Sequence, residues 1–208
     1  MDIRLKLVQI THALLQKAGR GGSFPGELAL KMDPDFIQKF KMPEIVVLVT
    51  GTNGKTTTSN LIAESLRKAG LKVINNRRGD NLNVGIATLL ASNANSKYEV
   101  QGDAAVIEVD ELTLYRQFKN LHPTILVVNN FFRDQLDRAG EMETIIRKIQ
   151  EVTKDFTGDI ILNGDDPNTL RIQDTALKAR IHTFSVDRNE VSKDKTDEAS
   201  EGKFCPRC

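Results

Sequence analysis

The segment GTNGKTTT constrains this chain more than any other, because it directly follows the apolar run IVVLVT at residues 45–50. The short, β-branched run predicts a buried strand, and the residues after the loop have a pattern typical of a helix. A glycine-rich turn between a strand and a helix brings free N–H groups and the positive end of the helix dipole to one point. The segment therefore predicts a loop that binds the phosphates of a nucleotide.

Each residue type in this loop suits phosphate binding. Gly51 and Gly54 let the backbone approach phosphate oxygens closely, and we expect Lys55 to reach the β- and γ-phosphates. We expect the Thr56 hydroxyl to bind a Mg²⁺ ion that also takes phosphate oxygens and waters. The common GxxxxGK[ST] spacing is not fully met, because Val49 stands where that pattern has its first glycine. A strand-to-helix turn without a ligand is the plainer alternative.

The rest of the chain continues the alternation of short apolar runs and helical patterns. Continuous apolar strands are typical of a sheet that is covered on both faces. We therefore predict an α/β fold with a mainly parallel sheet flanked by helices. The further predicted strands cover residues 71–75, 104–109, 124–129, 159–163 and 181–186, and the predicted helices cover 57–69, 84–92 and 141–155.

Three regions are predicted along the chain. Residues 1–44 contain an amphipathic helix over the first 18 residues and a glycine-rich connector that we expect to be extended or looped, and they are too few for a domain. Residues 45–186 form the nucleotide-binding domain. Residues 187–208 are strongly polar, which predicts a charged linker. They end in Cys205 and Cys208, whose spacing suits metal binding better than a disulfide.

Charge and hydropathy exclude several classes of protein. Lys and Arg number 29 against 28 Asp and Glu, so the net charge of +1 gives no general attraction to nucleic acid. The apolar runs are far shorter than the roughly 20 residues of a membrane-spanning helix. The first residues also lack the uninterrupted apolar core of a signal peptide. We expect a cytoplasmic protein without a membrane-spanning segment and without a nucleic-acid partner.

Polar clusters follow three of the later strands. VIEVDE ends in acidic residues, of which we take Glu108 as a second Mg²⁺ ligand, whereas Asp110 and Glu111 either join the site or cap the next helix. NNFFRDQLDR and LNGDDP follow the next two strands. The carboxyl ends of parallel strands meet at one edge of a sheet, so these clusters are expected to converge with the loop.

Together, GTNGKTTT, NNFFRDQLDR and LNGDDP resemble the central ATPase domain of the Mur ligase family. More narrowly, GRGGSFPGELALKMDP, VIEVDE and the terminal CPRC are similar to the family's subunits that amidate lipid II, and the resemblance covers essentially all 208 residues. It implies an ATP-dependent ligase for peptidoglycan biosynthesis that acts at the inner face of the cell membrane. Such a ligase converts the α-carboxyl of D-glutamate to D-isoglutamine through an acyl phosphate, with ammonia from a glutaminase partner of the GatD type.

The resemblance also implies the site. It implies ATP, Mg²⁺ and Zn²⁺ as cofactors, with Mg²⁺ bound by Thr56 and Glu108, and Zn²⁺ by Cys205 and Cys208 as half of a four-cysteine site. The residues it places on ATP are Gly51, Thr52, Asn53, Gly54, Lys55, Thr56 and Thr57 at the phosphates, and Asn163 and Asp166 on the adenine side.

Several positions depart from the family pattern. DQLD has Gln135 where other Mur ligases have a histidine. The carbamylated lysine of those ligases corresponds to Ile149, with Lys148 adjacent, so we predict that no carbamylated lysine is present. Asp80 stands where the amidating subunits more often have a small residue, and the sequence assigns it no role.

The resemblance also implies that such chains continue beyond Cys208 into a domain that supplies a catalytic aspartate. We therefore expect these 208 residues to be a fragment that has no catalytic residue and binds nucleotide at best weakly. An amino-acid-adding Mur-type ligase, a folate-polyglutamating ligase and a non-catalytic ATP-binding module are the alternatives. Structural roles are expected for His12, His122 and His182, and a solvated surface loop for Arg77 and Arg78.

Overall fold

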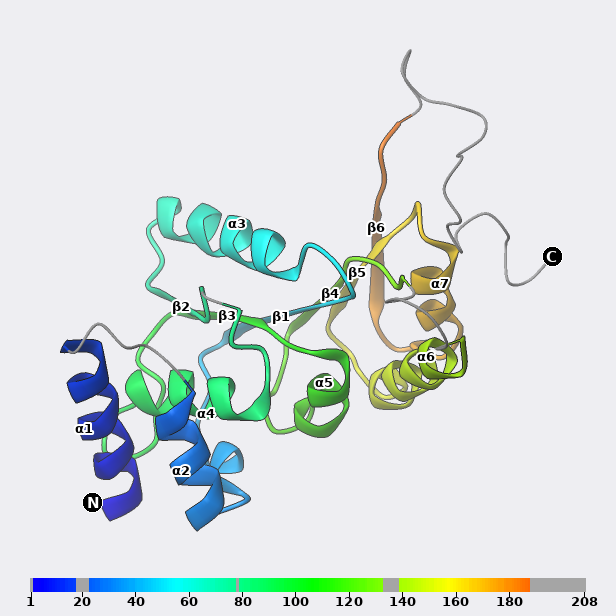
Figure 1. The fold of residues 1–208 in the computed structure, drawn as a ribbon. Helices are drawn as coiled ribbons and strands as arrows, with labels where there is room; N and C mark the ends of the chain where they lie inside the picture. Colours follow the sequence, from blue (N-terminus) through cyan, green and yellow to red (C-terminus); the bar gives the residue numbers. More distant parts are fainter. Residues whose placement is uncertain (1, 18–22, 78, 133–138, 188–208) are drawn as a thin grey trace.

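Figure 1 shows the computed structural model, which describes residues 2–17, 23–77, 79–132 and 139–187. Six strands form one sheet in the order β2-β3-β1-β4-β5-β6, and each neighbouring pair is parallel. This confirms the predicted α/β fold. The strands are β1 (Ile45–Thr50), β2 (Val73–Asn75), β3 (Ala104–Glu108), β4 (Ile125–Val128), β5 (Asp159–Asn163) and β6 (Arg180–Phe184).

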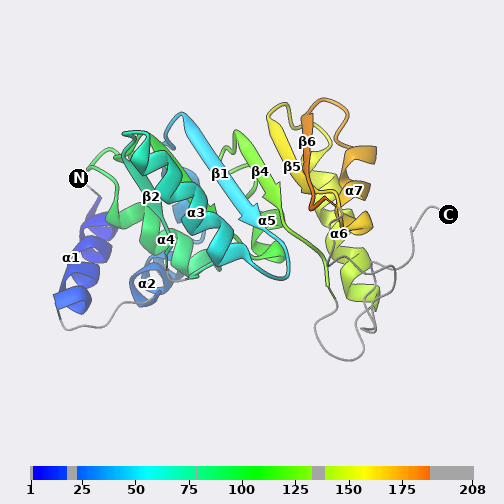
Figure 2. The ribbon, with the colours of Figure 1, turned by 90° about the horizontal axis from the view of Figure 1, so that it is seen from above.

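Helices cover both faces of the sheet, as Figures 1 and 2 show. The helix α3 lies on one face, and the other α-helices lie on the opposite face or at the β6 end. The α-helices are α1 (Ile3–Lys17), α2 (Phe24–Met32), α3 (Lys55–Lys68), α4 (Asn83–Ser92), α5 (Glu111–Gln117), α6 (Ala139–Thr153) and α7 (Pro167–Leu170), and the two 3₁₀ helices are η1 (Phe36–Lys39) and η2 (Arg171–Asp174).

The alternation of side chains along β1 divides the apolar core between the two faces. Val47 and Val49 pack toward α3 in a small cluster that includes Ala63. Val46 and Leu48 point the other way, into a larger cluster formed with the helices of the opposite face. A central parallel strand buried on both sides therefore needs the unbroken apolar run that its sequence has.

The region before β1 belongs to this larger cluster. Leu5 and Val8 of α1 and Ala29 of α2 are buried in it together with Phe36. The prediction of a helix at the start of the chain is confirmed. The prediction that the segment through residue 30 is extended or looped is wrong for its described part, because α2 begins at Phe24 with Pro25 at a position where a helix tolerates proline.

Glycine is required in α2 because two helices cross there at close range. A Cβ atom on Gly26 would lie 1.9 Å from the Val84 carbonyl oxygen and 2.6 Å from Thr88 Oγ1. The main-chain N–H of Gly26 donates a hydrogen bond of 2.8 Å to the same Thr88 hydroxyl. The glycine that suggested a loop instead permits α2 to pack directly against α4.

The strand register brings the expected polar clusters to one edge of the sheet. Val49 of β1 pairs with Glu108 of β3, and Thr50 pairs with Val128 of β4. Val128 in turn pairs with Leu162 of β5. The segments that follow these strands therefore start side by side. Among the residues that the structure describes, no helix is long and apolar enough to cross a membrane.

Candidate functional site

The loop between β1 and α3 has the backbone that a phosphate-binding turn requires. Gly51 and Gly54 have φ values of 125° and 77°, in the region that favours glycine. A Cβ atom on Gly51 would lie 2.9 Å from both the nitrogen and the oxygen of Asn130. Thr52 N donates to Asn130 O at 2.9 Å, and Asn53 N donates to Asn130 Oδ1 at 2.8 Å. The loop is thus fixed against the segment that follows β4.

A polar cavity of about 450 Å³ opens over this loop and the start of α3. It brings Glu108 together with all of the predicted phosphate-binding residues except Gly51. Gly51 lies against the main chain of Asn130 instead. Sequence reasoning missed Gly79 and Asn81, although both stand in the glycine-containing segment after β2. The cavity is lined by Thr52, Asn53, Gly54, Lys55, Thr56, Thr57, Gly79, Asn81 and Glu108.

Thr56 and Glu108 converge near the third glycine of the site. A Cβ atom on Gly79, whose φ is 75°, would lie 3.3 Å from Thr56 Oγ1 and 3.6 Å from Glu108 Oε2. Glu108 is buried, and its Oε1 accepts a hydrogen bond of 2.9 Å from Asn81 Nδ2. Its Oε2 is buried without a hydrogen-bond partner. A hydroxyl oxygen and an unpaired carboxylate oxygen that face one space fit a hard cation such as Mg²⁺.

This donor set is small, as expected for Mg²⁺ but not for structural zinc. Within the described ranges, no group of three or more His, Cys, Asp or Glu side chains is placed to hold a metal ion. Mg²⁺ commonly takes one or two protein ligands and completes its shell with phosphate oxygens and waters. Cys205 and Cys208 lie outside the described residues, so the zinc half-site stays a prediction.

Lys55 lies between the loop and a carboxylate on α5. Its Nζ donates to the carbonyl oxygens of Gly51 at 2.5 Å and Thr52 at 3.1 Å. It also lies 3.8 Å from Oε1 of Glu111. Burial raises the pKa of the Glu111 carboxyl, and the nearby Lys55 ammonium partly opposes that rise. Asp110 N-caps α5 through hydrogen bonds from the next turn, whereas the Glu111 side chain approaches Lys55.

A second, more apolar cavity of about 480 Å³ adjoins the loop at Gly54 and extends toward β5. Asn163 lines it, and its assignment to the adenine side stays a prediction. Asn129 also lines it, and the buried Oδ1 of this residue has no hydrogen-bond partner. The complete lining is Asn53, Gly54, Thr58, Ile62, Val127, Asn129, Asn130, Ile161, Asn163 and Phe184.

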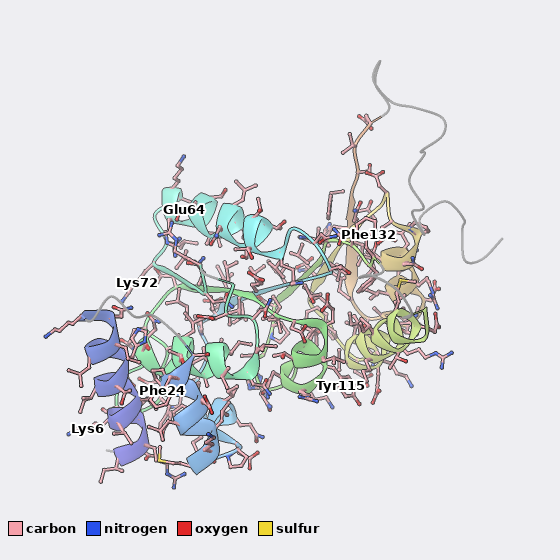
Figure 3. The ribbon with its side chains drawn as sticks, in the orientation of Figure 1. Lys6, Phe24, Glu64, Lys72, Tyr115 and Phe132 are labelled. Carbon is pink, nitrogen blue, oxygen red and sulfur yellow. The ribbon has the colours of Figure 1, made fainter. Side chains whose placement is uncertain are left out.

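Asp166 occupies a different position from the one we expected. It is buried, and its Oδ2 accepts a hydrogen bond of 2.6 Å from Phe131 N. Its Oδ1 accepts one of 2.9 Å from Asn168 N at the start of α7. Both oxygens are thus engaged with main chain, and the side chain does not line the cavity. Asp166 therefore holds the segment after β4 in place. This segment includes Phe132, which Figure 3 labels.

Three further positions named in the sequence analysis contact the core or neighbouring elements. Ile149 is fully buried in the core, and Lys148 Nζ lies 5.3 Å from the centre of the Tyr115 ring on α5. His182 Nε2 lies 2.8 Å from Asp159 Oδ1 on the neighbouring strand. Gln135 and Arg78 lie outside the described residues.

Comparisons with known proteins identify relatives of the chain. Residues 49–205 match the Mur ligase middle domain. The MurT subunit of lipid II isoglutaminyl synthase (glutamine-hydrolyzing) from Staphylococcus aureus strain COL is 34% identical over 197 residues, which are 91% of this chain and 42% of that protein. The MurT subunit from Streptococcus pneumoniae is 35% identical over 199 residues, covering 95% and 43%. The chain thus spans less than half the length of these relatives.

Solved structures share the fold. MurF from Acinetobacter baumannii superposes with a TM-score of 0.57 and 20% identity, covering 78% of this chain and 34% of that one. A pseudomurein peptide ligase type C from Methanothermus fervidus gives a TM-score of 0.50 and 26% identity, with 72% and 28% covered. The arrangement of sheet, loop and helices is therefore common to these proteins.

Proposed function

The chain belongs to the Mur ligase family, and on this premise we propose that it binds Mg²⁺ and ATP and serves in the amidation of lipid II. The observation that carries the proposal is the cavity where the 52–57 loop, the Thr56 hydroxyl and the unpaired Glu108 oxygen meet. The MurT relatives, at 34–35% identity, support lipid II as the substrate. We also propose that it acts in peptidoglycan synthesis at the inner face of the cell membrane.

The loop would bind the triphosphate through groups that already face the cavity. The main-chain N–H groups at the start of α3 and the dipole of this 14-residue helix favour an anion there. Lys55 would leave the carbonyls of Gly51 and Thr52 for the β- and γ-phosphates and offset the charge that develops on the transferred group. Asn163 and Asn129 would line the adenine side.

Thr56 and Glu108 would hold the Mg²⁺ ion, with Asn81 orienting the Glu108 carboxylate through the bond to Oε1. A bound Mg²⁺ ion neutralises phosphate charge and orients the γ-phosphate. Glu108 is fixed from the other side as well, because Asn76 Oδ1 accepts from its main-chain N–H at 2.8 Å. The Glu108 main chain and Oε1 are therefore held in place, and Oε2 is left for the ion.

The proposed chemistry has two steps. A carboxylate oxygen of the acceptor attacks the γ-phosphorus, which gives an acyl phosphate and releases ADP. Ammonia then attacks the acyl carbon, and inorganic phosphate leaves as the amide forms and a proton is lost. Free ammonia is mostly protonated at neutral pH, so a docked glutaminase of the GatD type is the proposed source.

An amidation assay tests this function. A complete protein containing this chain is incubated with lipid II, glutamine, Mg²⁺, ATP and the glutaminase subunit, and the product is analysed by mass spectrometry. Replacement of one carboxyl by an amide, with ADP release, is the expected result. Ligation of an amino acid without the glutaminase would instead support an amino-acid-adding ligase. Nucleotide binding with no turnover at all would support a non-catalytic module.

A further inference from the structure

A third cavity, of about 280 Å³, lies between α1, the end of β2 and α4. The chain after β2 contributes to it and also to the polar cavity over the 52–57 loop, which we call the phosphate cavity. Asn76 and Asp80 line the third cavity, and Gly79 and Asn81 line the phosphate cavity. The complete lining is His12, Gln16, Asn75, Asn76, Arg77, Asp80, Gly85, Thr88, Leu89, Ser92 and Asn93.

The chain after β2 is firmly attached to β3. The Asn76 side-chain amide donates to the carbonyl oxygens of Glu108 at 2.8 Å and Asp80 at 3.0 Å, and its oxygen accepts from Glu108 N. Asp80 also packs on the first turn of α4, where a Cβ atom on Gly85 would lie 2.5 Å from Asp80 Cβ. The main chain of Asp80 is therefore held between Asn76 and α4, and its side chain is exposed.

Three side chains of the lining have hydrogen-bonding groups to offer a ligand. Within the described part of the chain, the side chains of His12, Gln16 and Asp80 have no hydrogen-bond or ion-pair partner. Burial lowers the pKa of the His12 imidazole, so at neutral pH this ring is uncharged and presents one donor and one acceptor. Gln16 offers the same pair of functions through its amide, and Asp80 offers acceptors only.

The composition of the lining limits the class of ligand. Arg77 is the one cation in the described lining, and its guanidinium already pairs with Glu64 at 2.5 Å. The negative charge of a polyphosphate would therefore have little positive charge to balance it. Leu89 is the one large aliphatic residue there, and the carbon atoms of the polar side chains supply further apolar lining, so the ligand should combine apolar and hydrogen-bonding groups. The volume is at the small end of ligand sites, which suits one or two chemical units.

We propose that this cavity binds an amide- and hydroxyl-bearing part of the acceptor substrate, with Asp80 accepting its N–H or O–H groups and His12 and Gln16 completing its hydrogen bonds. The proposal rests on the proposed function, since it deepens the acceptor side of the same site. A ligand seated here lies near the phosphate cavity, because Asp80 stands between Gly79 and Asn81, which line that cavity. The proposal also gives Asp80 a role that the sequence did not assign.

Amide and hydroxyl groups occur in both the sugar and the peptide of the acceptor, and a fragment of each serves as a probe. The isotope-labelled chain is titrated, without nucleotide, with N-acetylmuramic acid in one series and with the dipeptide L-alanyl-D-glutamate in another, and amide NMR signals are followed. We expect at least one probe to shift the signals of His12, Gln16 and Asp80 in a saturable way. The series that responds identifies a sugar or a peptide as the occupant.

Variants make the test specific. Asp80→Asn keeps the shape but removes the charge, and we expect it to weaken binding of the active probe roughly tenfold, as for the loss of a charge-assisted hydrogen bond. His12→Ala is expected to weaken it several-fold. Lys6→Ala, on the outer side of α1 in Figure 3, is the matched control and should bind like the wild type. Unchanged affinity in both cavity variants, or no response to either probe, would overturn the proposal.

Nucleotide binding is measured separately on the same samples. Asp80→Asn and His12→Ala are expected to leave nucleotide affinity unchanged, because neither residue lines the phosphate cavity. A wild-type chain that binds nucleotide but neither probe would contradict the cavity assignment alone. A chain that binds a probe but no nucleotide would contradict the proposed function and with it the description of the occupant as an acceptor.

Discussion

The Nζ atom of Lys55 lies 3.8 Å from Oε1 of Glu111, with only 14% and 12% of the two side chains exposed. The ammonium that we assign to the phosphates is thus paired with a buried carboxylate when no nucleotide is bound. An anion that enters the cavity meets the Glu111 charge as well as the Lys55 charge. We therefore expect Glu111 to oppose nucleotide binding.

Replacing Glu111 by glutamine should raise stability at neutral pH by about 1 kcal/mol. Burial raises the pKa of this carboxyl in the folded chain above its unfolded value, so the folded state binds the proton more tightly. Its contribution to stability consequently falls as the pH rises through these pKa values. Thermal unfolding at several pH values should show a benefit of Glu111→Gln at pH 7 that disappears in acid. A benefit that is independent of pH would contradict this cause.

The same substitution should tighten nucleotide binding several-fold, since it removes a negative charge beside the phosphates and keeps a hydrogen-bonding group for Lys55. Calorimetry with an ATP analogue is the measurement. Glu27→Gln on the surface of α2 is the control for a general change of charge and should leave the affinity unchanged. Weaker binding in Glu111→Gln would show that Glu111 positions Lys55 for the phosphates.

Glu108→Gln should weaken the effect of Mg²⁺ on nucleotide affinity. The unpaired Oε2 is the carboxylate oxygen that faces Thr56, and an amide is a far weaker ligand for a hard cation. The ratio of the nucleotide dissociation constants without and with Mg²⁺ measures this effect. We expect that ratio to fall by about tenfold, which corresponds to about 1.4 kcal/mol. Titrations with Mg²⁺ and with a chelator measure it. An undiminished Mg²⁺ effect would remove Glu108 from the ion site.

Gly26→Ala should destabilise the fold by about 1–3 kcal/mol, because the added methyl group collides with the backbone of α4. Urea unfolding measures the change. Lys31→Ala, an exposed substitution in the same helix, should stay within about 0.5 kcal/mol of the wild type. Equal stability of the two variants would mean that α2 and α4 do not pack at this distance.

The sequence was sufficient to predict the sheet and the glycine turn between β1 and α3, because both depend on local patterns. Unbroken apolar runs such as IVVLVT mark buried parallel strands, and the glycines at 51 and 54 mark a turn whose φ values are positive. The convergence of Glu108 with the loop followed from the rule that parallel strands end at one edge. That prediction did not need contacts between distant residues.

The parts that were missed depend on tertiary contacts. Gly26 reads as a loop residue in isolation, and only the approach of α4 explains it within a helix. Asp166 is a plausible nucleotide ligand by position, yet the Phe131 N–H satisfies one of its oxygens from a segment 35 residues away. Asp110 and Glu111 are adjacent acidic residues, and the sequence did not show which of them caps the helix. In the structure Asp110 caps α5, and Glu111 lies near Lys55.

Binding of a non-hydrolysable ATP analogue, measured by calorimetry with Mg²⁺, tests the central claim most directly. The wild-type chain is predicted to bind one nucleotide per chain, with a dissociation constant below about 1 mM, the upper end of ordinary substrate affinities. Lys55→Ala is predicted to lose this binding and to keep its circular dichroism spectrum, while the exposed control Lys68→Ala keeps both. Absence of heat for the folded wild type at millimolar nucleotide, or full binding by Lys55→Ala, would contradict the account.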